Sequence, residues 1–314
     1  MGNMQKCGVV GVGFVGACCA YTLAVSGLFS EIVLVDVNRQ KAESEAADIN
    51  HGVSFAKPCH VGAGDYSDLS GCGLVILAAG ANQRPGETRV ALLGRNRTIL
   101  SAVVGQVVQA ARDAVLLVVS NPVDVLTCMA QRLSGLPAGR VIGSGTVLDT
   151  ARLKYLLGQR LGVDGRNVHA FIIGEHGDSE LAVWSSANIS GVDLDDYCRI
   201  TGIDDPAAVL RGIYESVRGA AYPIIEGKGA TYYGIAMAVR RIAEAIVCDE
   251  RSVLPVSSLI TGHYGVDGVC LGVPSIVGRG GVQAVLDIPL APEELAQLQR
   301  SARKMRALID EVDR

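Results

Sequence analysis

The sequence predicts an α/β protein in which a doubly wound parallel sheet, at residues 1–143, is followed by a mixed α+β domain at residues 144–314. Short runs of aliphatic and β-branched residues alternate with helix-like stretches, which is the order of a doubly wound fold. The short runs are apolar almost without interruption, as in parallel strands that are covered on both faces. The length of 314 residues, 49% of them hydrophobic, exceeds the commonest size of a single domain.

The elements follow from these patterns in chain order. Strands are expected at residues 6–12, 31–37, 60–64, 74–79, 114–119 and, more weakly, 140–143. Helices are expected between them at residues 15–26, 39–50 and 93–111. From about residue 145 the pattern changes to a long helix at 148–161, an apolar run at 168–173 and a late strand at 269–277. Residues 292–312 begin with Pro-Glu-Glu and carry an apolar stripe, which predicts a packing helix that closes the second domain.

Composition argues against several classes of protein. A formal net charge of -4 provides no basic field for nucleic acid. The nine cysteines are an odd number without any Cys-x-x-Cys pair, so we expect neither a disulfide framework nor a metal site. Cysteines without disulfide partners suit the reducing cytoplasm, where we expect the protein to act. The N-terminus lacks the features of a signal peptide and the apolar runs are strand-sized, so no membrane segment is expected.

A glycine-rich turn connects the first expected strand to the first expected helix. Its spacing, Gly11-x-Gly13-x-x-Gly16, lets the backbone approach a pyrophosphate closely and offer helix N-terminal amides to it. Asp36 ends the second expected strand, where a carboxylate accepts hydrogen bonds from ribose hydroxyls and repels a 2′-phosphate. The combination predicts a Rossmann domain that binds NAD rather than NADP, although such a turn also arises by chance in proteins that bind no nucleotide.

Two polar clusters in the second half carry candidate chemistry. Asp149 and Arg152 stand three residues apart near the start of an expected helix, so both side chains project from one face. His176 lies in a glycine-flanked turn and is followed by an acid and a hydroxyl, as expected of a proton donor on a fixed loop. Each also has a simpler explanation, namely an ordinary intrahelical ion pair and a structural loop histidine.

The chain resembles the L-lactate/malate dehydrogenase family along essentially its whole length. Beside the glycine-rich turn, the resemblance rests on Ser120-Asn-Pro-Val-Asp-Val125, Asp149-Thr-Ala-Arg152 and Gly174-Glu-His-Gly-Asp-Ser179. It implies an NAD-dependent enzyme that moves a hydride to a keto acid while a side chain supplies the proton. The expected cofactor contacts are Gly11, Gly13, Phe14, Val15, Gly16, Asp36, Ala79, Gly80 and Asn121.

The resemblance also implies roles for the catalytic side chains. Asp149 pairs with His176 and favours its imidazolium form, and Arg152 holds the substrate carboxylate through two parallel hydrogen bonds. Arg89 ends a lid loop and stabilises the developing alkoxide when the lid closes. Asn121 contacts the substrate oxygen or the nicotinamide. A solvated loop arginine and a turn-forming Asn-Pro are the simpler interpretations of the last two.

Gln83 bears on the choice of substrate. The malate enzymes of the family carry arginine at the corresponding place, where it neutralises a second carboxylate, whereas this chain has a neutral amide. An uncompensated charge there costs ~2–5 kcal/mol, so pyruvate suits the site better than a dicarboxylate. Thr231 matches the family residue that lines the methyl end of the pocket, although alone it is an ordinary helix threonine. Arg84 is adjacent to Gln83, which leaves malate dehydrogenase open as an alternative.

Regulation and assembly are expected from the resemblance alone. His169 resembles the histidine of bacterial members that fructose 1,6-bisphosphate activates, and the other interpretation is a partly buried histidine near a strand. Lys154 stands where the activated members usually carry arginine, and lysine cannot form the same bidentate phosphate contact. Family members are commonly homotetramers.

Together these expectations describe a cytoplasmic enzyme from the lactate-specific part of this family. It would interconvert pyruvate and (S)-lactate with NAD at the end of fermentation. Malate dehydrogenase is one alternative. A catalytically silent dinucleotide-binding protein that keeps the fold is the other, and it would need none of the catalytic side chains.

Overall fold

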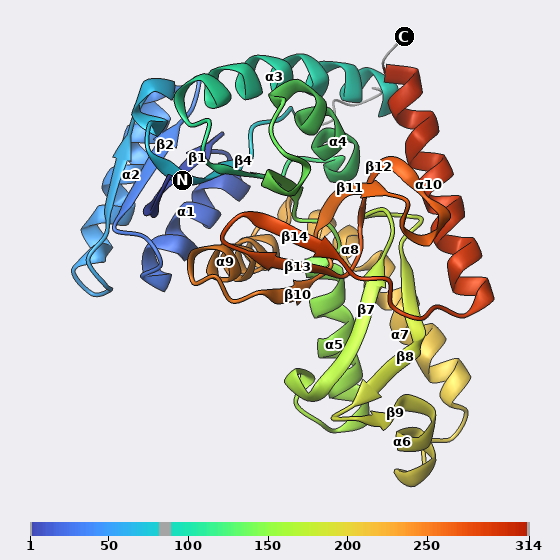
Figure 1. Cartoon of the computed structure of the whole chain (residues 1–314). Coiled ribbons are helices and arrows are strands. Elements are labelled where there is room, and N and C mark those ends of the chain that lie inside the picture. Colours follow the sequence, from blue (N-terminus) through green and yellow to red (C-terminus); the bar gives the residue numbers. More distant parts are fainter. Residues whose placement is uncertain (1, 82–88, 313–314) are drawn as a thin grey trace.

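A computed structural model describes residues 2–81 and 89–312 of the chain, with the backbone alone for residues 89–91 and 312. Its central feature is an eight-stranded sheet with the order β12-β11-β6-β5-β4-β1-β2-β3 (Figure 1). The strands of the N-terminal half, which are mutually parallel, are β1 (Asn3–Val10), β2 (Glu31–Val35), β3 (His60–Ala63), β4 (Cys72–Leu77), β5 (Val115–Val118) and β6 (Val141–Gly143). The chain winds outward from β1 in one direction and from β4 in the other, so the expected doubly wound sheet is confirmed, and its switch point lies between β1 and β4.

Two strands from the second half extend this sheet. β11 (Ser257–Thr261) pairs antiparallel with β6, and β12 (Asp267–Gly272) pairs antiparallel with β11. The single strand expected at residues 269–277 is wrong, because the chain leaves β12 and enters β13 (Ser275–Gly278) of another sheet. Pro274 lies between the two strands, and proline has no N–H with which to continue the ladder. The expected domain boundary near residue 144 stays a prediction.

Helices cover both faces of the sheet. One face carries α1 (Phe14–Ser26), α2 (Arg39–Val53) and α9 (Tyr233–Val247), and the other carries α3 (Arg89–Ala110), α4 (Val123–Ser134) and α10 (Pro292–Val312). Strand β5 shows why its sequence is continuously apolar. Val115 and Leu117 join the core on the α1 side, whereas Leu116 and Val118 join the core on the α3 side.

A separate lobe has its own apolar core and lies below the sheet in Figure 1. It contains α5 (Val147–Leu161), β7 (Val168–Ile173), β8 (Leu181–Ile189), β9 (Val192–Asp193), α6 (Leu194–Ile200) and α7 (Pro206–Gly219). The remaining elements are α8 (Ala221–Lys228), a small sheet of β10 (Ser252–Leu254), β13 and β14 (Gly281–Val285), and the 3-10 turns η1 (Tyr66–Leu69), η2 (Ala138–Arg140), η3 (Gly165–Asn167) and η4 (His263–Gly265). Within the described part of the chain, no helix combines the length and the apolar character that crossing a bilayer requires.

Helix α5 links the two regions. It begins four residues after β6 ends, so its N-terminus lies at the carboxyl edge of the parallel strands. Ligand contacts gather at this edge in open α/β sheets. Asp149, in the first turn of α5, therefore lies at the edge where the loops after β1, β4 and β5 also begin.

Candidate active site

The turn between β1 and α1 has the shape of a phosphate cradle. Gly11 has a φ of +91°, and a Cβ on it would lie 2.4 Å from the backbone nitrogen of Ala79 at the end of β4. A Cβ on Gly16 would lie 1.9 Å from the carbonyl oxygen of Gly11, so neither position accepts a side chain. Gly13 has open space around its Cα, and as the N-cap of α1 it has no side chain to satisfy the first-turn amides. These amides, including those of Phe14 and Val15, are free to receive an anion, which fits a dinucleotide pyrophosphate.

Asp36 lies beside this turn. Its Oδ2 accepts a hydrogen bond from the backbone N–H of Val12 at 2.6 Å, and its Oδ1 accepts one from that of Asn38 at 2.9 Å. The carboxylate therefore fixes the glycine-rich turn, which the sequence did not predict. Each carboxylate oxygen keeps capacity for a further donor, so the geometry supports the predicted contact with ribose hydroxyls.

The carboxyl ends of β4 and β5 are joined by polar contacts. Asn96 of α3, which is almost fully buried, accepts from the N–H of Ala81 at 2.8 Å and donates to the carbonyl of Asn121 at 3.1 Å. The hydroxyl of Ser120 donates to the carbonyl of Ala79 at 2.7 Å and lies against Gly80. The predicted contact residues of these two strand ends therefore form one rim, and Asn96, which the sequence did not identify, fixes their spacing.

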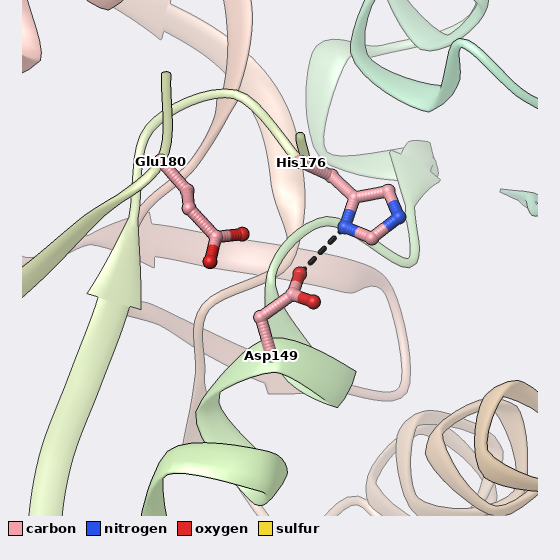
Figure 2. Close-up of side chains that lie close together, drawn as sticks. All are labelled: Asp149, His176 and Glu180. Carbon is pink, nitrogen blue, oxygen red and sulfur yellow. Dashed lines mark hydrogen bonds and ion pairs between the residues drawn. The ribbon is translucent and has the colours of Figure 1, made fainter. Parts of the chain in front are cut away.

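His176 and Asp149 meet because two threonines tie α5 to β7. The hydroxyl of Thr146 donates to the carbonyl of Ile172 at 2.6 Å, and the hydroxyl of Thr150 accepts from the N–H of the same residue at 2.9 Å. The chain then turns at Gly174, whose φ is +94°, and carries His176 over the start of α5 (Figure 2).

The predicted catalytic residues form a chain of contacts. Nδ1 of His176 lies 2.5 Å from Oδ2 of Asp149, and Nη1 of Arg152 donates to the other oxygen, Oδ1, at 2.7 Å. Asp149 is buried, with 2% of its side chain exposed, whereas the histidine ring is 27% and the guanidinium side chain 19% exposed. The carboxylate is thus covered by the side chains of His176 and Arg152, which both remain partly exposed to solvent.

Burial by itself lowers the pKa of His176, but the charge and hydrogen bond of Asp149 outweigh it and raise that pKa from 6.5 to about 9. Burial conversely raises the pKa of Asp149, and the facing charges of His176 and Arg152 lower it below its ordinary value. At neutral pH the pair is therefore an imidazolium and a carboxylate. Because Asp149 occupies Nδ1, the proton available to a substrate is the one on Nε2.

Asp124 binds the backbone of the loop that carries His176. Its Oδ2 accepts the backbone N–H of His176 at 2.7 Å, and its Oδ1 accepts the hydroxyl of Ser257 at 2.6 Å. The carboxyl is 2% exposed, and burial raises its pKa to about 6 although both hydrogen bonds oppose the shift. Asp124 lies in the matched motif after β5, but its contact with the histidine loop could not be predicted from the sequence.

Helix α10 holds the other side of the loop. The N–H of Glu175 donates to the hydroxyl of Ser301 at 2.9 Å, and Lys304 donates to the Glu175 carboxylate at 2.7 Å. Ser179 also donates to that carboxylate. The loop that carries His176 is thus fixed by residues of α4, α5 and α10.

Glu180 is a buried carboxyl that the sequence did not identify. It follows Ser179 at the entry to β8 and is 5% exposed. Its carboxyl group turns toward the Asp149–His176 pair (Figure 2). One carboxylate oxygen from each acid and one ring nitrogen of His176 all lie within 4.8 Å of one another.

Other predicted site residues are placed less directly. Gln83 and Arg84 lie outside the described residues, and Arg89 is described only as the backbone start of α3. Thr231 precedes α9, whose Gly234 lies against Leu148 at the start of α5, so it is at the same end of the molecule as Asp149.

The two residues predicted to bind a sugar bisphosphate lie on neighbouring elements. Lys154 of α5 is half-buried, which lowers its pKa, and His169 is exposed on β7. Among the described residues no hydrogen bond or ion pair joins them, so their role stays a prediction.

Comparisons with known proteins agree with this geometry. The model of the lactate/malate dehydrogenase NAD-binding domain matches residues 5–143, and that of the alpha/beta C-terminal domain of the same family matches residues 146–314. The L-lactate dehydrogenase of Thermoanaerobacter sp. (strain X514) is 52% identical over 310 residues, which cover 99% of this chain and 100% of that protein. L-lactate dehydrogenase 1 of Clostridium acetobutylicum is 50% identical over 312 residues, with 99% and 100% covered.

Solved structures show the same agreement. The minor L-lactate dehydrogenase from Enterococcus mundtii, crystallised in the ligands-bound form, superposes with a TM-score of 0.94 at 42% identity and covers 98% of each chain. A lactate dehydrogenase from a Medee basin deep-sea metagenome library superposes with a TM-score of 0.96 at 45% identity and covers 100% of each chain.

Proposed function

The chain belongs to the lactate/malate dehydrogenase family, and we propose that it is an NAD-dependent L-lactate dehydrogenase, which interconverts pyruvate and (S)-lactate. One observation carries the proposal: a single buried carboxylate, Asp149, contacts both His176 and Arg152 at hydrogen-bond distance. A proton donor and a carboxylate-binding cation are thereby held together at the carboxyl edge of a nucleotide-binding sheet.

His176 performs the proton transfer. Asp149 fixes the ring through Nδ1, so Nε2 carries the proton toward the substrate carbonyl, and the raised pKa keeps that proton in place at neutral pH. The nicotinamide, when bound, supplies or accepts the hydride. In lactate oxidation the same ring receives the hydroxyl proton.

Arg152 binds the substrate carboxylate. One of its five N–H groups is used by Asp149, and the remaining donors match a carboxylate in a planar, bidentate arrangement. The rigid guanidinium sets the distance from the carbonyl carbon to the ring of the cofactor. Arg89, whose side chain lies outside the described residues, is proposed to stabilise the alkoxide.

The cofactor is NAD. Gly11, Gly13 and Gly16 shape the turn that would receive the pyrophosphate, and the carboxylate of Asp36 stands where a 2′-phosphate would be repelled. Reoxidation of NADH by pyruvate places the reaction at the end of sugar breakdown under fermentation.

Two observations support pyruvate as the substrate. The relatives reported above are L-lactate dehydrogenases, and Gln83 carries a neutral amide. Initial rates with NADH and either pyruvate or oxaloacetate, measured side by side, test it. Faster turnover of pyruvate with (S)-lactate as the product supports the proposal, and faster turnover of oxaloacetate makes the chain a malate dehydrogenase. Absence of turnover with both would support a silent dinucleotide-binding protein. The variant Gln83→Arg serves as the matched comparison, because it should shift the preference toward oxaloacetate.

We further propose that the enzyme is a homotetramer that acts in the cytoplasm. Helices α1 and α9 pack together yet expose Tyr21, Val25, Tyr233 and Met237, and these apolar side chains suit contact with another copy of the chain. Nine free thiols suit a reducing compartment. Light scattering at several protein concentrations would measure the mass directly.

Activation by fructose 1,6-bisphosphate through Lys154 and His169 is a separate proposal. Turnover at low pyruvate should rise when the sugar bisphosphate is added. No change in turnover would refute it.

A further inference from the structure

Glu180 is a buried acid beside the catalytic pair. The residue is 5% exposed, and its Oε1 has no hydrogen-bond partner among the described residues. Its backbone is anchored, because the hydroxyl of Tyr214 on α7 donates to the Glu180 carbonyl at 2.6 Å. The main chain is therefore held while the carboxyl group faces the catalytic pair.

Charged groups approach this carboxyl from three elements. Asp149 and Arg152 belong to α5, His176 belongs to the same loop as Glu180, and Arg218 belongs to α7. The nearest cations already have an anionic partner, since both His176 and Arg152 are bound to Asp149. An ionised Glu180 would be a second buried carboxylate close to Asp149, and its Oε1 has no hydrogen-bond donor among the described residues, so the cost of burying its charge is large and the group takes up a proton instead.

The spacing of His176 and Asp149 is that of a hydrogen bond and not that of two ligands of one metal ion. Donor atoms about 2.0–2.1 Å from a tetrahedral zinc ion lie roughly 3.3 Å apart. His176 Nδ1 and Asp149 Oδ2 are 2.5 Å apart, which is a hydrogen-bond separation with no room for an ion between them.

We propose that Glu180 is a positioning residue for proton transfer, whose carboxyl group is neutral at neutral pH and whose ionisation in alkaline solution holds the proton on His176. The idea rests on the proposed function, because it concerns the same imidazolium. Burial raises the pKa of Glu180 to about 8, with a further rise from the charge of Asp149 and opposing effects of His176 and Arg152. The charges of Asp149, Asp124 and Glu180 in turn raise the pKa of His176.

The sign of the effect follows from this coupling. Pyruvate reduction needs protonated His176, so kcat/KM falls when the pH passes the pKa of that ring. As the pH rises, Glu180 ionises and adds a negative charge within 4.8 Å of the imidazolium. This charge stabilises the imidazolium, so His176 loses its proton only at higher pH. Without this carboxyl, the alkaline fall begins at lower pH.

The first test compares the pH dependence of kcat/KM for pyruvate in the wild type and in Glu180→Gln, whose amide has the shape of the neutral acid but cannot ionise. We expect the alkaline midpoint to fall by about one pH unit. Glu180→Asp, which still ionises, should recover part of the shift. Glu215→Gln removes an exposed carboxyl of α7 and is the matched control, with no expected shift.

Two outcomes of that test would overturn the proposal. One is an unchanged midpoint. The other is a loss of kcat/KM by the same factor at every pH, which would show that Glu180 only supports the fold.

The second test does not depend on turnover. Histidine labelled with ¹³C at the ε1 position allows the titration of His176 to be followed by NMR, with His176→Asn to assign its resonance among the five histidines. A lower His176 midpoint in Glu180→Gln than in the wild type supports the proposal even if pyruvate proves not to be the substrate. Equal midpoints contradict it, and midpoints that change when a chelator is added would identify a bound cation instead.

Discussion

Replacement of Asp149 by asparagine removes the charge behind the proton donor but keeps a side chain of similar size. The pKa of His176 is raised from 6.5 to about 9, which corresponds to about 3 kcal/mol in favour of the imidazolium. Burial acts in the opposite direction, and Asp149 makes the largest of the opposing contributions, ahead of Asp124 and Glu180. In Asp149→Asn only the two weaker charges still oppose burial, so the ring should titrate near its ordinary pKa.

The expected loss can be calculated for pyruvate reduction. At about pH 7.5 the protonated fraction of His176 falls from nearly all to roughly one tenth, so kcat/KM should fall about tenfold. At about pH 5.5 the ring of the variant is protonated again, and the part of the loss that comes from protonation shrinks to less than about twofold.

The assay is the decrease of nicotinamide absorbance at limiting pyruvate across this range of pH. Asp310→Asn, which removes an exposed carboxylate of α10, is the matched control and should follow the wild type. A deficit of Asp149→Asn that has the same size at every pH would refute the electrostatic reasoning and leave Asp149 with a purely geometric role.

Three further predictions concern single side chains. Arg152→Lys should raise KM for pyruvate about 10- to 100-fold, because an ammonium cannot make two parallel hydrogen bonds to a carboxylate, and an unchanged KM in steady-state kinetics would remove Arg152 from the binding site. Asp36→Ala should weaken NAD more than NADP in fluorescence titrations, whereas equal losses would count against a ribose contact. Glu180 has a pKa raised from 4.5 to about 8 in the folded protein, so its contribution to stability is fully present below pH 4.5 and is lost as the pH rises through about 8. In urea unfolding, Glu180→Gln should therefore be more stable than the wild type by about 3 kcal/mol near pH 7 and by less than about 1 kcal/mol near pH 5. Equal free energies of unfolding at pH 7 would show that the carboxyl does not take up a proton on folding.

The parallel part of the fold could be predicted because its strands are buried on both faces. Val115 to Val118 have no polar position, and the structure divides them between the two cores. The late strand at residues 269–277 was predicted as one element because apolar composition alone does not show where a chain changes sheet. Pro274 was the local signal that marked the break.

The candidate site could be predicted in part. Asp149, Arg152 and His176 were identified by their motifs, and the structure brings them together. Asp124 and Glu180 were not predicted, because their importance lies in contacts made only after folding. The N–H of His176 reaches Asp124 across 52 residues of sequence, and no periodicity encodes such a contact.

Turnover and cofactor binding of His176→Asn, measured on one preparation, show whether the imidazole is the proton donor. We expect NADH to bind with nearly wild-type affinity, because the contacts that hold His176 are with Asp124 and Asp149 and not with the glycine-rich turn, while kcat for pyruvate falls by about 10²- to 10⁴-fold. Turnover within a few-fold of the wild type, or a parallel loss of NADH binding and turnover, would contradict this expectation.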